Sequence, residues 1–266
     1  MHRSMWYYQS RKDDRDVIDK LNVLAEQYPT RGFDDYYSKI RNEGIGWNRK
    51  RVLRVYRQLG LKMRRKRKRR LPSRIKRPLS TPLRINHTWS MDFMSDSLSY
   101  GRKIRVLNVI DDYNREALAV EADFSFPSEK LVKTLNEVIF WRGKPERIRV
   151  DNGPEFISKL FMEWSEKNQI KILYTQPGKP MQNGYVERFN RLYREDILDA
   201  YLFEDMHQLR DLSYHWMEDY NQNHPHDALG KISPWKYASD FCIGGSPNTK
   251  NNNNQKMSKL ELSEKG

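Results

Sequence analysis

Apolar residues recur at helical spacing in the first sixty residues of the chain. This spacing predicts helices over residues 13–28, 34–42 and 49–59. Asn48 stands in the N-cap position of the third helix and Gly60 closes it. Val52, Tyr56 and Leu59 are expected to face inward on that helix. Three short helices in this order predict a small all-α, helix-turn-helix-like module.

From residue 86 onward, helical spacing gives way to short apolar runs. These runs predict strands over residues 88–94, 105–110, 117–124, 147–150 and 170–174. Helical spacing between and after them predicts helices over residues 128–141, 157–168, 182–198, 206–221 and 234–239. Turn sequences at 100–101 and 112–114 join the first three strands into antiparallel pairs. The order predicts an α/β, ribonuclease-H-like fold with a mixed five-stranded sheet and flanking helices.

A proline-containing segment separates the two patterned regions. Pro72, Pro78 and Pro82 prevent a helix from continuing through it. We therefore expect a helical module at 1–61, a basic linker at 62–85 and an α/β core at 86–240. The tail at 241–266 is polar, contains an asparagine tract and is expected to be disordered.

The net charge of +14 is concentrated in one part of the chain. Residues 49–77 contain sixteen Lys and Arg and no Asp or Glu. Such a block suits a polyanion, because neutralising phosphates releases counterions. The alternatives are a solvated charge run and a targeting tag. The position of the basic block between two foldable segments argues against a tag. The predicted DNA-binding residues here are Arg49, Arg51, Arg54, Arg64, Arg65, Lys66, Arg67, Lys68, Arg69 and Arg70.

The arginines of the third helix also allow an alternative interpretation, a plain helical bundle whose arginines only keep it soluble.

Other features exclude whole classes of protein. A single cysteine, Cys242, rules out a disulfide within the chain and a cysteine-rich zinc module. No apolar stretch is long enough to span a membrane, and the N-terminus lacks the apolar core of a signal peptide. A cytoplasmic location is therefore expected.

Three carboxylates are the candidate chemical groups. Asp92 interrupts a strand in which Trp89, Met91 and Phe93 face one side. A lone Asp weakens a strand unless something pairs with it, and a metal ion would supply that reason. Asp151 directly follows an apolar strand, where sites of α/β sheets commonly lie. Glu187 lies in the helix predicted over 182–198.

Each carboxylate taken alone has an ordinary structural explanation. Asn-Gly after Asp151 can mark a hairpin, although a helical pattern follows it here. Glu187 could pair with Arg191 one turn later. Asp96, Asp111 and Asp112 are competing candidates, and the last two suit turn-forming roles. Only the three residues Asp92, Asp151 and Glu187 together favour a site.

The sequences around these carboxylates resemble a known family. They are WSMDF (89–93), VIDDYNRE (109–116), DNGPEF (151–156), PGKP (177–180), QNGYVERFN (182–190) and YN (220–221) before PH (225–226). Asp92, Asp151 and Glu187 resemble the DDE triad of transposases with a retroviral-integrase-type core. The chain is similar, over about residues 6–240, to the second-frame (OrfB) product of bacterial insertion-sequence family three. His224 in place of the family's usual Arg and the Asn/Lys tail are departures outside the triad.

The resemblance implies DNA cleavage and strand transfer at the ends of a mobile element. It implies that the triad holds two Mg²⁺, or Mn²⁺ in their place, which would clamp the attacking and leaving oxygens. Lys179, Arg188 and Arg191 flank the triad and are expected to hold backbone phosphates. Expected partners are double-stranded DNA, further copies of the chain and the element's first-frame product, in the bacterial nucleoid. The alternatives are a ribonuclease-H-like nuclease without strand transfer and a non-catalytic DNA-binding regulator.

Overall fold

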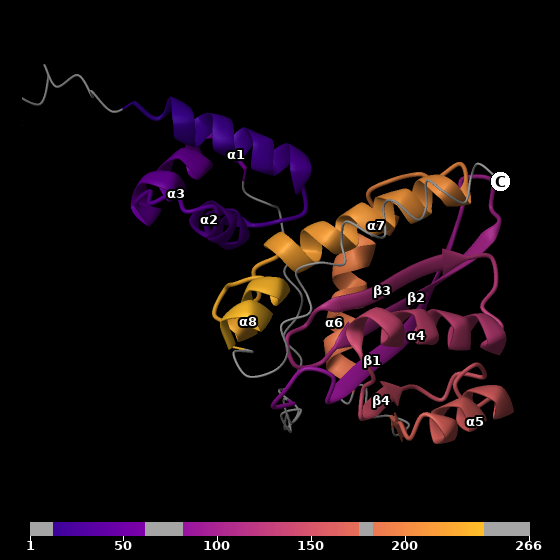
Figure 1. The fold of residues 1–266 in the computed structure, drawn as a ribbon. Coiled ribbons are helices and arrows are strands. Elements are labelled where there is room, and N and C mark those ends of the chain that lie inside the picture. Colours follow the sequence, from indigo (N-terminus) through magenta and orange to yellow (C-terminus); the bar gives the residue numbers. More distant parts are fainter. Residues whose placement is uncertain (1–12, 62–81, 176–182, 242–266) are drawn as a thin grey trace, which may run out of the picture.

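The computed structural model describes residues 13–61, 82–175 and 183–241 (Figure 1). Its helices are α1 (Arg15–Gln27), α2 (Phe33–Asn42), α3 (Arg49–Gln58), α4 (Ser128–Arg142), α5 (Lys159–Lys167), α6 (Gly184–Tyr193), α7 (Met206–Asn223) and α8 (Pro234–Phe241). A π-helix, η3 (Arg194–Leu198), and a 3₁₀ turn, η4 (Asp227–Leu229), complete them. The strands are β1 (Thr88–Ser97), β2 (Lys103–Asp111), β3 (Ala117–Asp123), β4 (Arg147–Val150) and β5 (Lys171–Tyr174).

The three N-terminal helices pack around their own hydrophobic cluster, which includes Val17, Leu21, Ile40 and Val52. The apolar spacing predicted each helix, and all three are present with bounds shifted by at most two residues. The Asn48 side chain accepts a hydrogen bond from the Lys50 amide at 2.8 Å, so the predicted N-cap of α3 is confirmed. The boundaries predicted for the domains stay a prediction.

The sheet has the strand order β3-β2-β1-β4-β5. β1, β2 and β3 are antiparallel neighbours, while β4 and β5 run parallel to β1. Short turns connect the antiparallel strands, and helices α4 and α5 connect the parallel ones, as parallel pairing requires. The mixed five-stranded sheet with flanking helices confirms the predicted ribonuclease-H-like fold.

Helices cover both faces of the sheet, and the alternation of side chains along each strand decides which residue meets which layer (Figure 1). Trp89 and Met91 of β1 pack with α4 and α5 in one cluster. Met94 of β1 and Val106 of β2 pack with α6 and α7 in the other. The even-numbered positions of β1, Asp92 among them, therefore face α6.

Two local features differ from the sequence-based predictions. β1 continues to Ser97, three residues beyond its predicted end, because its register with β2 runs unbroken to Lys103. The helix predicted over 182–198 is α-helical to Tyr193 and continues as the π-helix η3. Residues 62–81 of the predicted linker, which include its basic run 64–70, and residues 176–182 and 242–266 lie outside the described part of the chain.

The helical module contacts the core through the segment between α1 and α2. Thr30 Oγ1 donates a hydrogen bond to Asp196 Oδ1 at 2.7 Å, and Arg31 forms an ion pair with Asp196 Oδ2. Tyr28 donates to Asp219 at 2.7 Å. Asp196 belongs to η3 and Asp219 to α7, so the module is tied to both elements. In the described part of the chain, no helix is long and apolar enough to cross a membrane.

Candidate active site

Asp92 and Asp151 come from neighbouring parallel strands. The β1–β4 pairing runs from Thr88↔Arg147 to Ser90↔Arg149, and the same offset of 59 residues places Asp92 beside Asp151. Neighbouring strands lie about 4.8 Å apart in a sheet. Asp151 follows Val150, the last residue of β4. The register therefore brings the two predicted aspartates to the same point of the sheet.

Asp92 is held by hydrogen bonds to both of its carboxylate oxygens. The Phe93 amide donates to Oδ1 at 2.8 Å, and Asn190 Nδ2 of α6 donates to Oδ2 at 2.8 Å. Asn190 Oδ1 in turn accepts a hydrogen bond from Asn108 Nδ2 at 2.7 Å. Asn108 lies opposite Asp92 in the β1–β2 register and is fully buried. A chain of side-chain hydrogen bonds thus links β2, α6 and the carboxylate of β1.

Glu187 lies on α6, three residues before Asn190, which places both on one face of the helix. Its side chain is exposed, while Asn190 is buried against the sheet. Burial, together with the nearby negative charges of Asp151 and Glu187, raises the pKa of Asp92 to about 6. Asp151 and Glu187 therefore both lie within electrostatic range of Asp92.

Asp151 occupies an exposed turn between β4 and α5, and the predicted exit into a helix is confirmed. Its Oδ1 accepts a hydrogen bond from the Gly153 amide at 3.0 Å. A Cβ at Gly153 would lie 3.0 Å from that same oxygen, closer than normal packing allows. Glycine at this position therefore lets the turn close around the carboxylate.

The competing aspartates have structural roles. Asp111 is buried and accepts hydrogen bonds from the amides of Asn86 and Tyr113, both at 2.8 Å. Asp112 is buried and pairs with Arg149. Asp96 pairs with Arg194 at 2.9 Å. The contacts of Asp111 agree with the turn-forming role predicted for it, whereas the side chain of Asp112 pairs with Arg149 of β4.

The donor set suits a hard divalent cation. It consists of carboxylate oxygens alone, which Mg²⁺ prefers. A cation would also relieve the repulsion that contributes to the raised pKa of Asp92. Among the described residues, no three His, Cys, Asp or Glu side chains are already arranged closely enough to hold an ion. Glu187 is exposed and its negative charge acts on Asp92, so the donor chemistry of these three residues fits such an ion.

The predicted DNA-binding residues fall into three groups. Arg49, Arg51 and Arg54 form ion pairs within the helical module, with Asp34 or Asp14. Arg188 and Arg191 are exposed on α6 beside Glu187, and Arg191 lies 3.4 Å from Glu195. Residues 64–70 and Lys179 lie outside the described part of the chain.

Sequence reasoning missed Asn108 and Asn190 as parts of this site. Asn190 follows Glu187 by three residues, so helical spacing could have placed it beside Glu187. Asn108 is the polar residue in an otherwise apolar run, Val106 to Ile110. A buried amide needs hydrogen-bond partners, which is the clue that the run contained.

Comparisons with known proteins identify the family to which the chain is similar. The family model described as "Integrase core domain" matches residues 82–180, and a second model with the same description matches residues 168–234. The uncharacterized 31.7 kDa protein of insertion element IS407 from Burkholderia multivorans is 33% identical over 241 residues, covering 90% of this chain and 87% of that protein. Transposase InsD of insertion element IS2 from Escherichia coli is 26% identical, covering 88% of this chain and 81% of that protein.

A longer relative is also similar. The uncharacterized 39.2 kDa protein of insertion element IS476 from Xanthomonas euvesicatoria is 34% identical over 222 residues, which cover 84% of this chain. This chain spans only 64% of that protein's length. Among solved structures, the catalytic core domain of the HTLV-2 integrase in complex with magnesium matches with a TM-score of 0.47 and 23% identity. The match covers 58% of this chain and 97% of that one.

Proposed function

This chain belongs to the integrase-core family of bacterial insertion-element transposases, which are polynucleotidyl transferases, and we propose that Asp92, Asp151 and Glu187 are its catalytic residues. The reaction would be metal-dependent DNA cleavage followed by strand transfer. The β1–β4 register carries the proposal, because its continuation sets Asp92 beside Asp151. The Asn190–Asp92 hydrogen bond supports it by holding α6, and with it Glu187, against the same point.

The three carboxylates would hold two Mg²⁺, and Mn²⁺ could replace them. Bound ions would supply Lewis-acid activation of water and would stabilise charge on the phosphate oxygens. Asp92 projects from β1, and Asp151 from the turn directly after β4, where the Gly153 amide holds its carboxylate, so these two would fix the geometry. Glu187, on the solvent side, would complete the site. Asn190 orients Asp92 through its 2.8 Å hydrogen bond and leaves the carboxylate ionised for metal binding.

Two phosphodiester displacements would follow in this one site. Water attacks the phosphorus at the element end, the bond to the 3′ oxygen breaks, and a free 3′-hydroxyl remains. That hydroxyl then attacks a phosphodiester of the target DNA, joining the strands and releasing a new 3′ end. No protein nucleophile takes part, so no tyrosine or serine is assigned to the reaction. Arg188, exposed one residue after Glu187, is placed to contact a backbone phosphate.

The substrate would be double-stranded DNA, both the element ends and the target. The basic block 49–77 supports this, because its charge suits a phosphate backbone. We propose that several copies of the chain assemble on DNA, with the first-frame product of the element as a possible further subunit. The site of action would be the nucleoid in the bacterial cytoplasm.

The test uses the full-length chain, Mg²⁺ and duplexes that carry the terminal sequences flanking its gene. Asp92→Asn, Asp151→Asn and Glu187→Gln should each abolish cleavage and joining while DNA binding persists. Asp96→Asn is the matched control, because Asp96 lies on the same strand but pairs with Arg194. Near-normal cleavage by a triad variant would remove that residue from the site. Cleavage without joining would favour a nuclease, and binding without either reaction would favour a regulator.

A further inference from the structure

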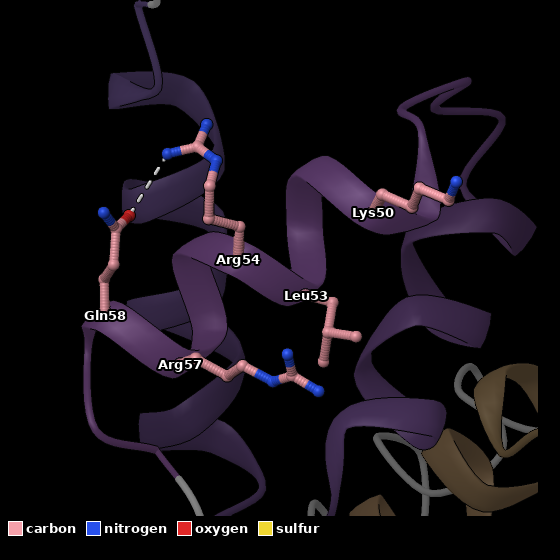
Figure 2. Close-up of a pocket in the computed structure, with 5 residues that line it drawn as sticks. All are labelled: Lys50, Leu53, Arg54, Arg57 and Gln58. Atoms are coloured by element: carbon pink, nitrogen blue, oxygen red, sulfur yellow. Dashed lines mark hydrogen bonds between the residues drawn. The ribbon is translucent and has the colours of Figure 1, made fainter. Parts of the chain in front are cut away.

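One face of α3 is hollowed and exposed. A hollow of about 430 Å³ is lined by Lys50, Leu53, Arg54, Arg57 and Gln58 (Figure 2). Their spacing of three and four residues places them along a single face of the helix. The opposite face, with Val52, Val55 and Tyr56, is buried in the module. The lining contains three cationic side chains and no carboxylate.

The basic residues of α3 divide into those bound within the module and those left exposed. Arg49 pairs with Asp34 at 2.6 Å, and Arg51 pairs with Asp14 at 3.0 Å. Lys50 and Arg57 are exposed, and neither has an acidic partner within residues 13–61, 82–175 and 183–241. Their charges are therefore available to a ligand, whereas those of Arg49 and Arg51 are partly neutralised.

Arg54 connects the two groups. Its Nη2 donates to Asp14 Oδ2 at 2.7 Å, and its Nη1 donates to Gln58 Oε1 at 3.3 Å (Figure 2). With Oε1 engaged, the Nε2 amide group of Gln58 is directed outward. Figure 2 shows Arg57 and Leu53 extending toward the same side of the helix, away from this pair. Asp14 and Arg54 thus orient the exposed face of α3 and do not themselves recognise a ligand.

We propose that this face of α3 enters the major groove of duplex DNA and reads its sequence through Arg57 and Gln58. An α-helix fits the major groove, where an arginine fork recognises guanine and a glutamine amide recognises adenine. Leu53 lies one turn before Arg57 on the same helix and would contact a thymine methyl group, while Lys50 would contact a phosphate. The inference rests on the proposed function only in taking DNA as the substrate.

The charge of the hollow favours this occupant. Three cations around one apolar side chain match a polyanion that also presents methyl groups, which is the composition of a major-groove edge. The basic block continues through residue 77, so added phosphate contacts would hold the helix against the groove. The sequence-based prediction of Arg49, Arg51 and Arg54 as DNA contacts is thereby refined. We assign their main role to orientation of the module.

The experiment exposes the full-length chain, without divalent ions, to a randomised 30-base-pair duplex library and sequences the bound fraction. The wild type should enrich a sequence motif. Arg57→Lys keeps the charge but loses the planar fork, so it should bind DNA of random sequence normally and lose about 10-fold or more of the preference at one base position. Gln58→Ala should lose preference at a neighbouring position. Arg147→Lys, an exposed arginine of the core, is the matched control and should retain the motif.

Three results would overturn the assignment. In the first, the wild-type chain binds DNA without enriching any motif. In the second, the variants of Arg57 and Gln58 retain the full motif. In the third, a polyglutamate peptide binds this face more tightly than duplex DNA does. Both substitutions lie on the exposed surface, and an unchanged circular dichroism spectrum would confirm the fold. Divalent-ion-dependent cleavage by the Arg57→Lys chain tests the triad separately, so failure of either proposal leaves the other intact.

Discussion

Removing the carboxylate of Asp196 tests how the helical module is attached to the core. Asp196 accepts hydrogen bonds from Thr30 at 2.7 Å and from Trp216 at 2.9 Å, and it pairs with Arg31. The side chains of Arg31 and Asp196 are only 9% and 10% exposed. Asp196→Ala would therefore leave a buried guanidinium without its counterion.

The expected loss of stability is large for a single substitution. Breaking a buried ion pair by deleting one partner costs about 3–5 kcal/mol, because the remaining charge stays desolvated. Thr30 and Trp216 also lose hydrogen bonds to this charged carboxylate, and the cost of deleting the carboxylate includes that loss. Partial opening of the interface would let water reach Arg31 and reduce the cost. We therefore expect Asp196→Ala to lower the free energy of unfolding by about 3–5 kcal/mol.

Equilibrium urea unfolding at pH 7, followed by far-ultraviolet circular dichroism, measures this loss. Asp199→Ala is the matched control, because Asp199 lies next to η3, is 60% exposed and has only a 3.6 Å contact with Arg194. Its effect should stay within about 0.5 kcal/mol. In the Asp196→Ala chain, Arg31→Leu should recover part of the stability by removing the unpaired charge. A loss below about 1 kcal/mol, or no recovery by Arg31→Leu, would refute the reasoning.

Three further predictions concern the site and the linker. The pKa of Asp92 is raised from an ordinary value of 3.8 to about 6 in the folded chain. The protonated form of Asp92 is therefore favoured by folding. Its contribution to stability is fully present below pH 4 and is lost as the pH rises through 6. Without divalent ions, Asp92→Asn should therefore be more stable than the wild type at pH 7, by at most about 3 kcal/mol, and equal stability in thermal unfolding would contradict this. Gly153→Ala should lower the cleavage rate about 10-fold, because the new Cβ displaces the Asp151 carboxylate, and a rate unchanged from the wild type would show that the turn adapts. Neutralising residues 64–70, seven cations in the sequence, should weaken binding to all DNA alike. It should also reduce the slope of log binding constant against log salt concentration by about six. A loss of binding confined to one DNA sequence would instead show that the linker recognises DNA sequence.

The order of elements was predictable from the sequence, because each element is encoded by a local pattern. Short apolar runs marked β1 and β2, and the end of β4 at Val150 was predicted to the residue. The three carboxylates were identifiable as candidates because Asp92 and Asp151 stand at informative positions of strands, and Glu187 stands in a motif that resembles a family. Helix ends such as the change to a π-helix at Arg194 were not predictable, since the apolar pattern continues unchanged through them.

What the sequence alone determined is therefore the set of elements, their order along the chain and which carboxylates to examine. Tertiary structure decided how the polar side chains are shared among partners. Arg51 and Arg54 looked equivalent to Arg57 in the sequence, yet Asp14, nearly forty residues earlier, engages the first two and leaves Arg57 exposed. Asn108 reaches Asn190 across 82 residues in the same way. Such pairings depend on packing between distant segments, because a side chain's partner is chosen by position in space, whereas periodicity records only the local backbone.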